Sequence, residues 1–453
     1  MTDEISLPSY LRGRFAPVPE ESTATDLTVR GLLPPELDGH YLRNGPNPLP
    51  GEDTGHWFSG PGMLHGVRLR GGRAEWYRNR WVRTRELEGH PFVRDDLTLD
   101  LTATPANTHV IRHAGTVLAL HEAGLPHWVT PSLETVGPYD FAGRLTTAMT
   151  AHPKEDPVTG ELHLFGTGFT PPYLTYHRVT AEGLLLDSRT VDVPGPTMMH
   201  DFAITEHHIV WLDLPVVFDP ALAGRRGMPY RWDDGYGARL GVMPRTPGST
   251  QVDWFDVDPC YVFHVGNAHE DASGRIVLDA VRYDRDGFRH CWSSLAGHTS
   301  PVGPAARAPR PRRAPAVLHR WTLDPAVPRQ VTESRLDDRA AEFPTHNRAR
   351  TGRPHRYLYT VRDDGIVKHD LTRDSTRTYE TPGGRHAGEA VFVPAVDGTG
   401  EDEGWLLSLV SDDDGAAGEL LVLDAVDLSV QAVVELRHPV PAGFHGSWLP
   451  EPP

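Results

Sequence analysis

Lysine and cysteine are scarce in this sequence, and each scarcity excludes a kind of chemistry. Only two lysines, Lys154 and Lys368, stand beside 42 arginines in 453 residues. This leaves little room for a Schiff base or a lysine nucleophile. The two cysteines, Cys260 and Cys291, are too few for a disulfide framework or for a zinc site built from cysteines.

Long apolar runs and excess positive charge are also lacking. The start of the sequence, MTDEISLPSYLRGRF, shows no basic stretch followed by an apolar one, and no apolar run approaches the roughly 18–20 residues of a membrane span. We therefore expect a cytoplasmic protein. The formal net charge of −17 argues against nucleic acid as a partner, because phosphates need a basic surface.

What the sequence does contain is a series of short β-rich runs separated by turn residues. They are rich in Val, Leu, Tyr and Trp, and most end in Gly, Asp or Asn, which is typical of strands and turns. Examples are TVLALHEAG, ELHLFGTGF, HHIVWLDLPVVFD, RIVLDAVRYD, HRYLYTVRDDG, GWLLSLVSDDDG, ELLVLDA and VQAVVEL. Long segments with a 3.6-residue apolar period are absent. We predict an all-β fold, and the length favours a propeller formed by 1–453 as a single domain.

Two segments depart from this pattern. The Pro/Ala/Arg-rich stretch 301–315 cannot form the interior of a strand, so we expect a solvated loop. The stretch 215–241 is too long and irregular for a tight hairpin. It is either a cap over one face of the β-structure or a plain surface excursion.

Four of the 25 histidines lie in distinctive settings: His152 in TAHPKEDP, His200 in TMMHDFAIT, His264 in YVFHVGNAHED and His445 in GFHGSWLP. The first two gaps between them are about the length of one four-stranded blade, and the third spans several blades. In a propeller, the inner strands of different blades line one channel, so such residues can converge there. Four imidazoles would suit Fe, Zn, Cu or Ni. The alternative is that each histidine has a structural role.

The chain resembles the carotenoid cleavage oxygenases, a family of carotenoid-, apocarotenoid- and stilbene-cleaving non-haem iron dioxygenases, from end to end. The resemblance rests on eleven segments in order: YLRNGPNP (41–48), HWFSGPGMLHGV (56–67), YRNRWVRT (77–84), ANTHVI (106–111), ALHEAGLP (119–126), AHPKEDP (151–157), MHDFAIT (199–205), FHVGNAHED (263–271), EFPTHN (342–347), GEAVFVP (388–394) and FHGSW (444–448).

This resemblance implies a seven-bladed β-propeller with a cap of loops and short helices over the iron face. It implies one Fe(II) per subunit and an enzyme that uses O2 to cleave a conjugated C=C bond of a carotenoid or apocarotenoid into two carbonyl products. The family's iron ligands fall on four positions: His152, His200, His264 and His445. Its three glutamates that orient ligand imidazoles fall on Glu122, Glu342 and Glu389, which leaves His152 without a glutamate partner. Thr108 falls on a family residue near the open coordination positions.

Two departures from the family pattern bear on the substrate. Many members have Asp-Gly-Asp where this chain has Ser59-Gly60-Pro61, which changes the turn but removes no ligand. Stilbene-cleaving members carry a lysine before the first of these glutamates, and here that position is His121. This favours a carotenoid or apocarotenoid over a hydroxystilbene or phenylpropenoid, although His121 could also hydrogen-bond a phenol.

Other functions and partners stay open. A propeller binding protein with an inactive metal site is the main alternative of another class, and a zinc hydrolase on the same ligands is a third. Apolar substrates partition into lipid, so we expect peripheral membrane contact through PVVFDPALA at 215–223, unless this stretch forms the cap's own core. The sequence does not predict the oligomeric state.

The segment CYVFHVGNAHED contains two histidines five residues apart. His264 follows an apolar run and takes the ligand position that the resemblance implies. His269 lies in a polar stretch that we predict to be a turn, and we give it no metal role.

Overall fold

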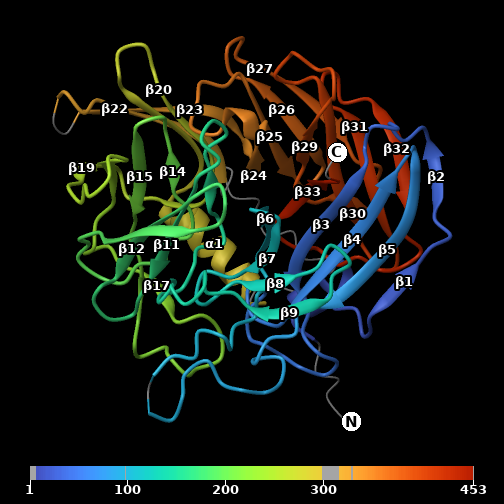
Figure 1. Ribbon diagram of the computed structural model, residues 1–453, viewed down its shortest axis with the longest axis horizontal. Coiled ribbons are helices and arrows are strands. Elements are labelled where there is room, and N and C mark those ends of the chain that lie inside the picture. The colour runs from blue at the N-terminus through green and yellow to red at the C-terminus, as the bar shows by residue number, and fades with distance from the viewer. Residues whose placement is uncertain (1–6, 97, 298–315, 328–329, 452–453) are drawn as a thin grey trace.

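The computed structural model describes residues 7–96, 98–297, 316–327 and 330–451, and its strands form seven blades around a central axis (Figure 1). Each blade is an antiparallel sheet of four to six strands. The predicted all-β, seven-bladed propeller is therefore confirmed. The stretch 301–315, predicted to be a solvated loop, lies outside the described residues.

The two ends of the chain close the propeller by crossing into each other's blades. The final strand, β33, pairs with β3, so that Trp448 lies opposite Tyr41. The early strand β2 pairs in turn with β32 of the last blade. The first blade contains β33 (Gly446–Pro450), β3 (Gly39–Pro46), β4 (Gly62–Arg70), β5 (Arg73–Trp81) and β1 (Ser22–Ala24). The last contains β28 (Arg385–Ala387), β29 (Val391–Pro394), β30 (Gly404–Asp412), β31 (Gly418–Asp424), β32 (Val430–Glu435) and β2 (Thr28–Gly31).

Five four-stranded blades follow one another between these two. The second blade is β6 (His109–His113), β7 (Thr116–Leu120), β8 (His127–Val129) and β9 (Thr135–Pro138). The third is β10 (Lys154–Glu155), β11 (Leu162–Thr167), β12 (Leu174–Val179) and β13 (Leu185–Thr190). The fourth is β14 (Ala203–Ile204), β15 (His208–Asp213), β18 (Arg239–Pro244) and β19 (Asp253–Asp256). The fifth is β20 (Tyr261–Glu270), β21 (Ile276–Tyr283), β22 (Ala316–Leu323) and β23 (Val331–Ala340), and the sixth is β24 (Glu342–Thr345), β25 (Tyr357–Arg362), β26 (Gly365–Asp370) and β27 (Ser375–Glu380).

The local sequence explains these strands and their turns. Every β-rich run quoted above contains a strand of the structure, because Val, Leu and Tyr pack well on a half-buried pleated surface. The turn between β20 and β21 is typical. There the Asp271 side chain accepts the backbone N–H groups of Ser273 and Arg275, and Gly274 has a φ of +78° that other residues rarely adopt.

Residues outside the blades form a cap of loops, short helical turns and one hairpin. Within the predicted cap stretch 215–241, strands β16 (Val216–Phe218) and β17 (Tyr230–Trp232) pair with each other, while the last residues already belong to β18. The helix α1 (Arg285–Leu295) is the one α-helix of the described residues; the resemblance implied short helices in the cap, but not their positions. Three 3₁₀ turns complete the list: η1 (Ser9–Leu11), η2 (Gly13–Phe15) and η3 (Arg348–Arg350).

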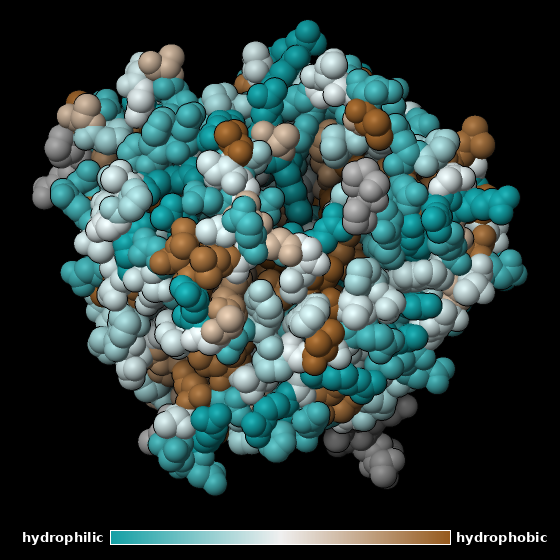
Figure 2. Space-filling view, viewed as in Figure 1, coloured by the Kyte–Doolittle hydropathy of each residue, from teal (hydrophilic) through white to brown (hydrophobic). Residues whose placement is uncertain are grey.

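The core lies between neighbouring blades rather than at one central point. In the largest apolar cluster, the fully buried Trp211 stacks on Phe202 with ring centroids 5.6 Å apart. Outside the core, the visible face is mostly hydrophilic, with small apolar groups and a hollow near its middle (Figure 2). Among the described residues, no helix has the length and apolar character that crossing a bilayer would require.

We predict that Trp211→Ala lowers the free energy of unfolding by about 3–5 kcal/mol, because it leaves a large cavity between blades. Trp128 is 43% exposed on β8 and provides a matched control. Trp128→Ala should change the unfolding free energy by less than about 0.5 kcal/mol. Urea denaturation of both variants measures the difference, and equal losses would contradict this account of the core.

Candidate metal centre

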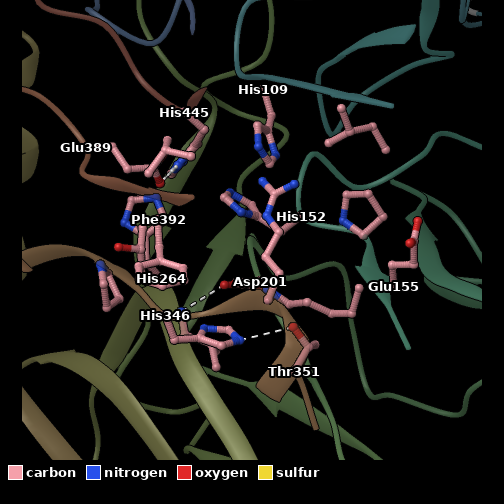
Figure 3. A pocket seen from close by; sticks show the side chains of 18 of the residues that line it. His109, His152, Glu155, Asp201, His264, His346, Thr351, Glu389, Phe392 and His445 are labelled. Atoms are coloured by element: carbon pink, nitrogen blue, oxygen red, sulfur yellow. Dashed lines mark hydrogen bonds and ion pairs between the residues drawn. The ribbon is translucent and has the colours of Figure 1, made fainter. Parts of the chain in front are cut away.

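The innermost strands of the blades surround a cavity on the propeller axis, with a volume of about 380 Å³ (Figure 3). Its wall is mixed, because strands β6, β10 and β20 turn histidine and charged side chains inward while apolar side chains such as Ile111 and Phe392 lie between them. The polar lining residues include His109, Arg112, His152, Lys154, Glu155, Asp201, His264, His346, Arg348, Glu389 and His445. We call this space the axial cavity.

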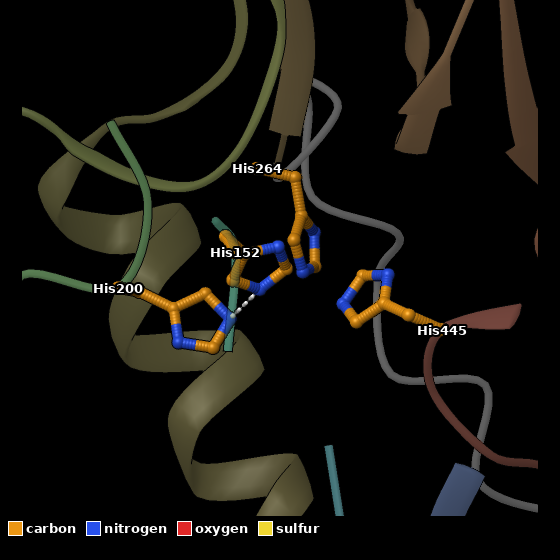
Figure 4. Close-up of side chains that lie close together, drawn as sticks. All are labelled: His152, His200, His264 and His445. Atoms are coloured by element: carbon orange, nitrogen blue, oxygen red, sulfur yellow. Dashed lines mark hydrogen bonds between the residues drawn. The ribbon is translucent and has the colours of Figure 1, made fainter. Parts of the chain in front are cut away.

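The four histidines chosen from the sequence meet at the inner end of the axial cavity (Figure 4). Each comes from a different blade: His152 just before β10, His200 just before β14, His264 within β20 and His445 just before β33. One ring nitrogen of each lies within 4.8 Å of the others, and three of the four residues are buried. The structure thus brings together residues that are up to 293 positions apart.

The spacing of these nitrogens fits a single metal ion. The Nε2 atoms of His152 and His200 are 3.0 Å apart. Two imidazoles at right angles on one ion would be separated by about 3 Å, because such metal–nitrogen bonds are about 2.1 Å long. Imidazole nitrogens suit Fe, Zn, Cu and Ni, so the donor set fits a divalent transition metal.

Three glutamates, of which Glu389 is buried and the other two are partly exposed, hold the outer nitrogens of three of these rings. The His200 Nδ1–H donates to Glu122 over 2.9 Å, His264 Nδ1–H to Glu342 over 2.5 Å, and His445 Nδ1–H to Glu389 over 2.8 Å. Each bond fixes its ring so that Nε2 remains for a metal. No carboxylate of the described residues hydrogen-bonds the His152 ring, in line with the pattern that the resemblance implies.

Two of these glutamates stay ionised despite their burial. Burial raises the pKa of Glu122, but the charge of His200 and its hydrogen bond outweigh that effect and lower the pKa to about 2. Glu389 shows the same balance with His445, and its pKa also falls to about 2. The site therefore carries negative charge next to rings that would be neutral ligands.

Glu342 belongs to a longer chain of hydrogen bonds. Its Oε1 accepts the Tyr283 hydroxyl over 2.7 Å, and its Oε2, which holds the His264 ring, also accepts the backbone N–H of Phe343. Burial raises the pKa of Glu342, yet the charge of His264 and these bonds bring it below its usual value.

Asp201 joins three of the histidine-bearing segments, a role that was not predicted from the sequence. Its carboxylate is 2% exposed and accepts Lys154 Nζ over 2.7 Å and the backbone N–H of Val265 over 2.8 Å. Lys154 lies two residues after His152, whereas Val265 directly follows His264 and Asp201 directly follows His200. One buried carboxylate therefore fixes the relative positions of three rings.

A second, smaller cavity of about 120 Å³ lies against the other side of the histidines. Most of its wall is apolar and comes from the cap and the strand ends: Trp57, Phe58, Met228, Phe263, Leu295, Phe343 and Phe444. Thr108, His121, Glu122 and Glu342 also line it. The Thr108 hydroxyl donates to Asn107, whose amide in turn donates to the carbonyls of Phe58 and Gly60. We call this space the apolar cavity.

The structure also shows where His269 and the apolar stretch 215–223 lie. His269 lies inside strand β20, so the predicted turn is wrong. It faces His355 with ring centroids 5.6 Å apart and lies about 16 Å along the strand from His264, since strands rise about 3.3 Å per residue. In the apolar stretch expected at a membrane, Val217 is 7% exposed, and Phe218 is partly exposed and packs on Phe169. Membrane contact through this stretch stays a prediction.

His109 also lies near the centre, and its place there was not predicted from the sequence. It begins β6 and its ring centroid is 5.3 Å from that of His445 and 6.0 Å from that of His152. Its Nδ1–H donates to the backbone carbonyl of Ala151 over 2.9 Å. Burial, followed by the charge of His445, lowers the pKa of His109 to about 3, so the ring is neutral near pH 7.

Comparison with known proteins gives consistent matches over nearly the whole chain. Residues 15–450 match the family described as RPE65, retinal pigment epithelial membrane protein. A carotenoid cleavage oxygenase of Mycobacterium tuberculosis is 38% identical over 510 aligned positions, which cover 97% of each chain. Among solved structures, the lignostilbene dioxygenase of Pseudomonas brassicacearum has a TM-score of 0.84 at 27% identity, covering 99% of this chain and 100% of that one. The cobalt-substituted Synechocystis ACO has a TM-score of 0.80 at 28% identity, covering 96% and 97%.

We predict that Asp201→Asn lowers the free energy of unfolding of the metal-free chain by about 3 kcal/mol, because it leaves the Lys154 ammonium without its buried partner. Asp338, whose side chain is 85% exposed in its pair with Arg335, provides the control. Asp338→Asn should cost less than about 1 kcal/mol. Chemical denaturation compares the two, and a negligible loss in Asp201→Asn would contradict the role given to this carboxylate.

Proposed function

This chain belongs to the carotenoid cleavage oxygenase family, and we propose that it is an Fe(II)-dependent dioxygenase that uses O2 to cleave a conjugated C=C bond. We propose a carotenoid or apocarotenoid as the substrate and two carbonyl compounds as the products. The observation that carries this proposal is the cluster of four histidine nitrogens within 4.8 Å, three of whose rings donate to glutamates.

In this proposal the four clustered histidines hold one Fe(II), and the glutamates orient three of them. Bound Fe(II) would supply the activation of O2 that no side chain can provide. Glu122, Glu342 and Glu389 offset the charge of the dication, because the histidines themselves bind as neutral ligands. Thr108 lies at the apolar side of the cluster, and we propose that it borders the positions left open on the metal.

The apolar cavity is the proposed site of the double bond. Its aromatic walls exclude water from the reacting atoms and make van der Waals contacts with several sides of a conjugated substrate chain. Its volume of about 120 Å³ is below the roughly 300–1,000 Å³ of common ligand sites. We therefore expect the cap segments that carry Trp57, Met228 and Leu295 to move when a long substrate enters.

One observation favours a second substrate class, the hydroxystilbenes and phenylpropenoids. His121 lines the apolar cavity, and its Nδ1 accepts the backbone N–H of Ala123 over 3.3 Å. The neutral ring then carries its proton on Nε2, where it could donate to a phenol oxygen. The similarity to a lignostilbene dioxygenase agrees with this alternative as well as with the first.

The activity is tested by incubating the iron-loaded chain with a panel of apocarotenals and with resveratrol and identifying the products by mass spectrometry. We expect apocarotenal cleavage that stops when O2 is removed. Cleavage of resveratrol alone would replace the first substrate class by the second. A chain that holds iron yet cleaves neither compound would point to a binding protein with an inactive site, and activity with Zn²⁺ under anaerobic conditions would point to a hydrolase.

We predict that His264→Ala abolishes stoichiometric iron binding, whereas His269→Ala leaves the metal content unchanged. His264 contributes one of the four clustered nitrogens, and His269 lies in the same strand but away from the cluster. Metal analysis of both purified variants after loading with Fe(II) measures the effect. Retention of one iron per chain by His264→Ala would refute the proposed ligand set.

A further inference from the structure

The histidine cluster separates two cavities, of which the axial one carries many more polar and charged groups than the apolar one. His264 and His445 contribute to the walls of both, whereas His152 faces the axial cavity and His200 the apolar one. The apolar cavity is lined mainly by aromatic side chains of the cap and of strand ends. The axial cavity has a mixed wall, in which histidine and charged side chains lie beside apolar ones such as Phe392 (Figure 3). A metal ion and an apolar substrate therefore meet very different walls on their way to the same point.

The apolar wall is a poor route for a divalent cation. An ion that leaves water for an apolar environment loses hydration free energy of tens of kcal/mol unless polar groups replace its water. Trp57, Phe58 and Phe444 carry no ligand for it. The two carboxylates of this wall, Glu122 and Glu342, already accept hydrogen bonds from histidine rings. The axial cavity, in contrast, has room for a partly hydrated ion and polar groups that can replace water molecules one at a time.

The mouth of the axial cavity lies at the protein surface. Glu155 is exposed there, with 51% of its side chain accessible, and a shallow surface pocket shares Arg112, Glu155 and Arg348 with the axial cavity. The cations near it are partly compensated, since Lys154 pairs with Asp201. The entrance is therefore mixed in charge and does not exclude a cation.

His109 has one nitrogen available at the inner end of this route. Because a carbonyl oxygen only accepts, the bond to Ala151 requires that His109 Nδ1 carries the proton, so the neutral ring has its lone pair on Nε2. This nitrogen has no hydrogen-bond partner among the described residues, yet its ring lies beside two members of the cluster. His346 lines the same cavity but differs, because its Nε2 already bonds Thr351 over 3.0 Å and its ring also bonds the backbone of Gly266.

We propose that the metal ion reaches the four histidines through the axial cavity, and that His109 Nε2 is the last transient ligand it meets before the cluster. The inference rests on the proposed metal centre and adds an access route and a residue that transfers the ion. Substrate and metal then use opposite sides of the same cluster. His109 is not one of the resident ligands, so its loss changes the rates of metal uptake and release but not the affinity.

The test measures cobalt transfer, using the absorption of Co²⁺ bound to the full-length chain. Uptake is followed after mixing metal-free chain with Co²⁺, and release after adding a hydrophilic chelator to the loaded chain. We expect His109→Ala to slow both rates by about tenfold and by the same factor, so that the dissociation constant is unchanged. His346→Ala, which removes a histidine from the same wall, should keep both rates.

A second measurement needs no change in the axial cavity. Met228→Trp narrows the apolar cavity, and should leave cobalt uptake unchanged while it raises the KM for the substrate. Normal rates in His109→Ala, a lowered affinity in that variant, or slower uptake in Met228→Trp would each overturn the inference. If the unaltered chain binds neither Co²⁺ nor Fe(II), the proposed metal centre itself is wrong. This outcome differs from a failure of the access route, in which the unaltered chain still binds the metal.

Discussion

The pairing of β33 with β3 is the contact on which the metal centre depends. It closes the ring of blades and places His445, near the end of the sequence, against histidines from the third, fourth and fifth blades. The pairing of β2 with β32 joins the first and last blades through the other end of the chain. Because neither terminal strand completes a blade without its distant partner, we propose that the propeller and its cap unfold as one domain.

Closure alone would bring the rings near one another without fixing how they point. The orientation comes from four carboxylates with different tasks, of which Asp201 and Glu389 are buried and the other two are partly exposed. Glu122, Glu342 and Glu389 each hold an outer ring nitrogen, while Asp201 ties the backbone of one histidine segment to the lysine of another. A buried carboxylate with such partners stays ionised, and the low pKa of Glu122 and Glu389 expresses that balance. The cluster is thus preorganised, has negatively charged carboxylates beside it and borders the apolar cavity on one side.

The sequence allowed the fold and most of the centre to be predicted, for identifiable reasons. Strands such as β30 and β31 have strong local patterns, and the settings of the four clustered histidines, together with the family resemblance, pointed to one site. The run HHIVWLDLPVVFD contains β16, but local pattern could not predict its partner β17 or the bridge between Val217 and Thr197, because both contacts join separate segments of the chain. Helix α1 was missed because its sequence, RDGFRHCWSSL, buries only Gly287 and Phe288.

The remaining misses involve contacts between distant segments. Asp201 resembles any aspartate that follows a histidine, and only the approach of blades three and five reveals its partners. His109 lies in the quoted ANTHVI motif, but its distance from His445 depends on ring closure. The polar neighbours of His269 predict a turn, whereas β20 continues through them to Glu270.

The central claim is that four histidines from four blades hold one metal ion at the propeller axis. X-ray absorption at the iron edge of the Fe(II)-loaded chain tests it most directly. The account predicts one iron per chain, with a first shell that includes four imidazole nitrogens at about 2.1 Å. Fewer than four imidazoles, or a shell in which carboxylate oxygens replace them, would contradict it.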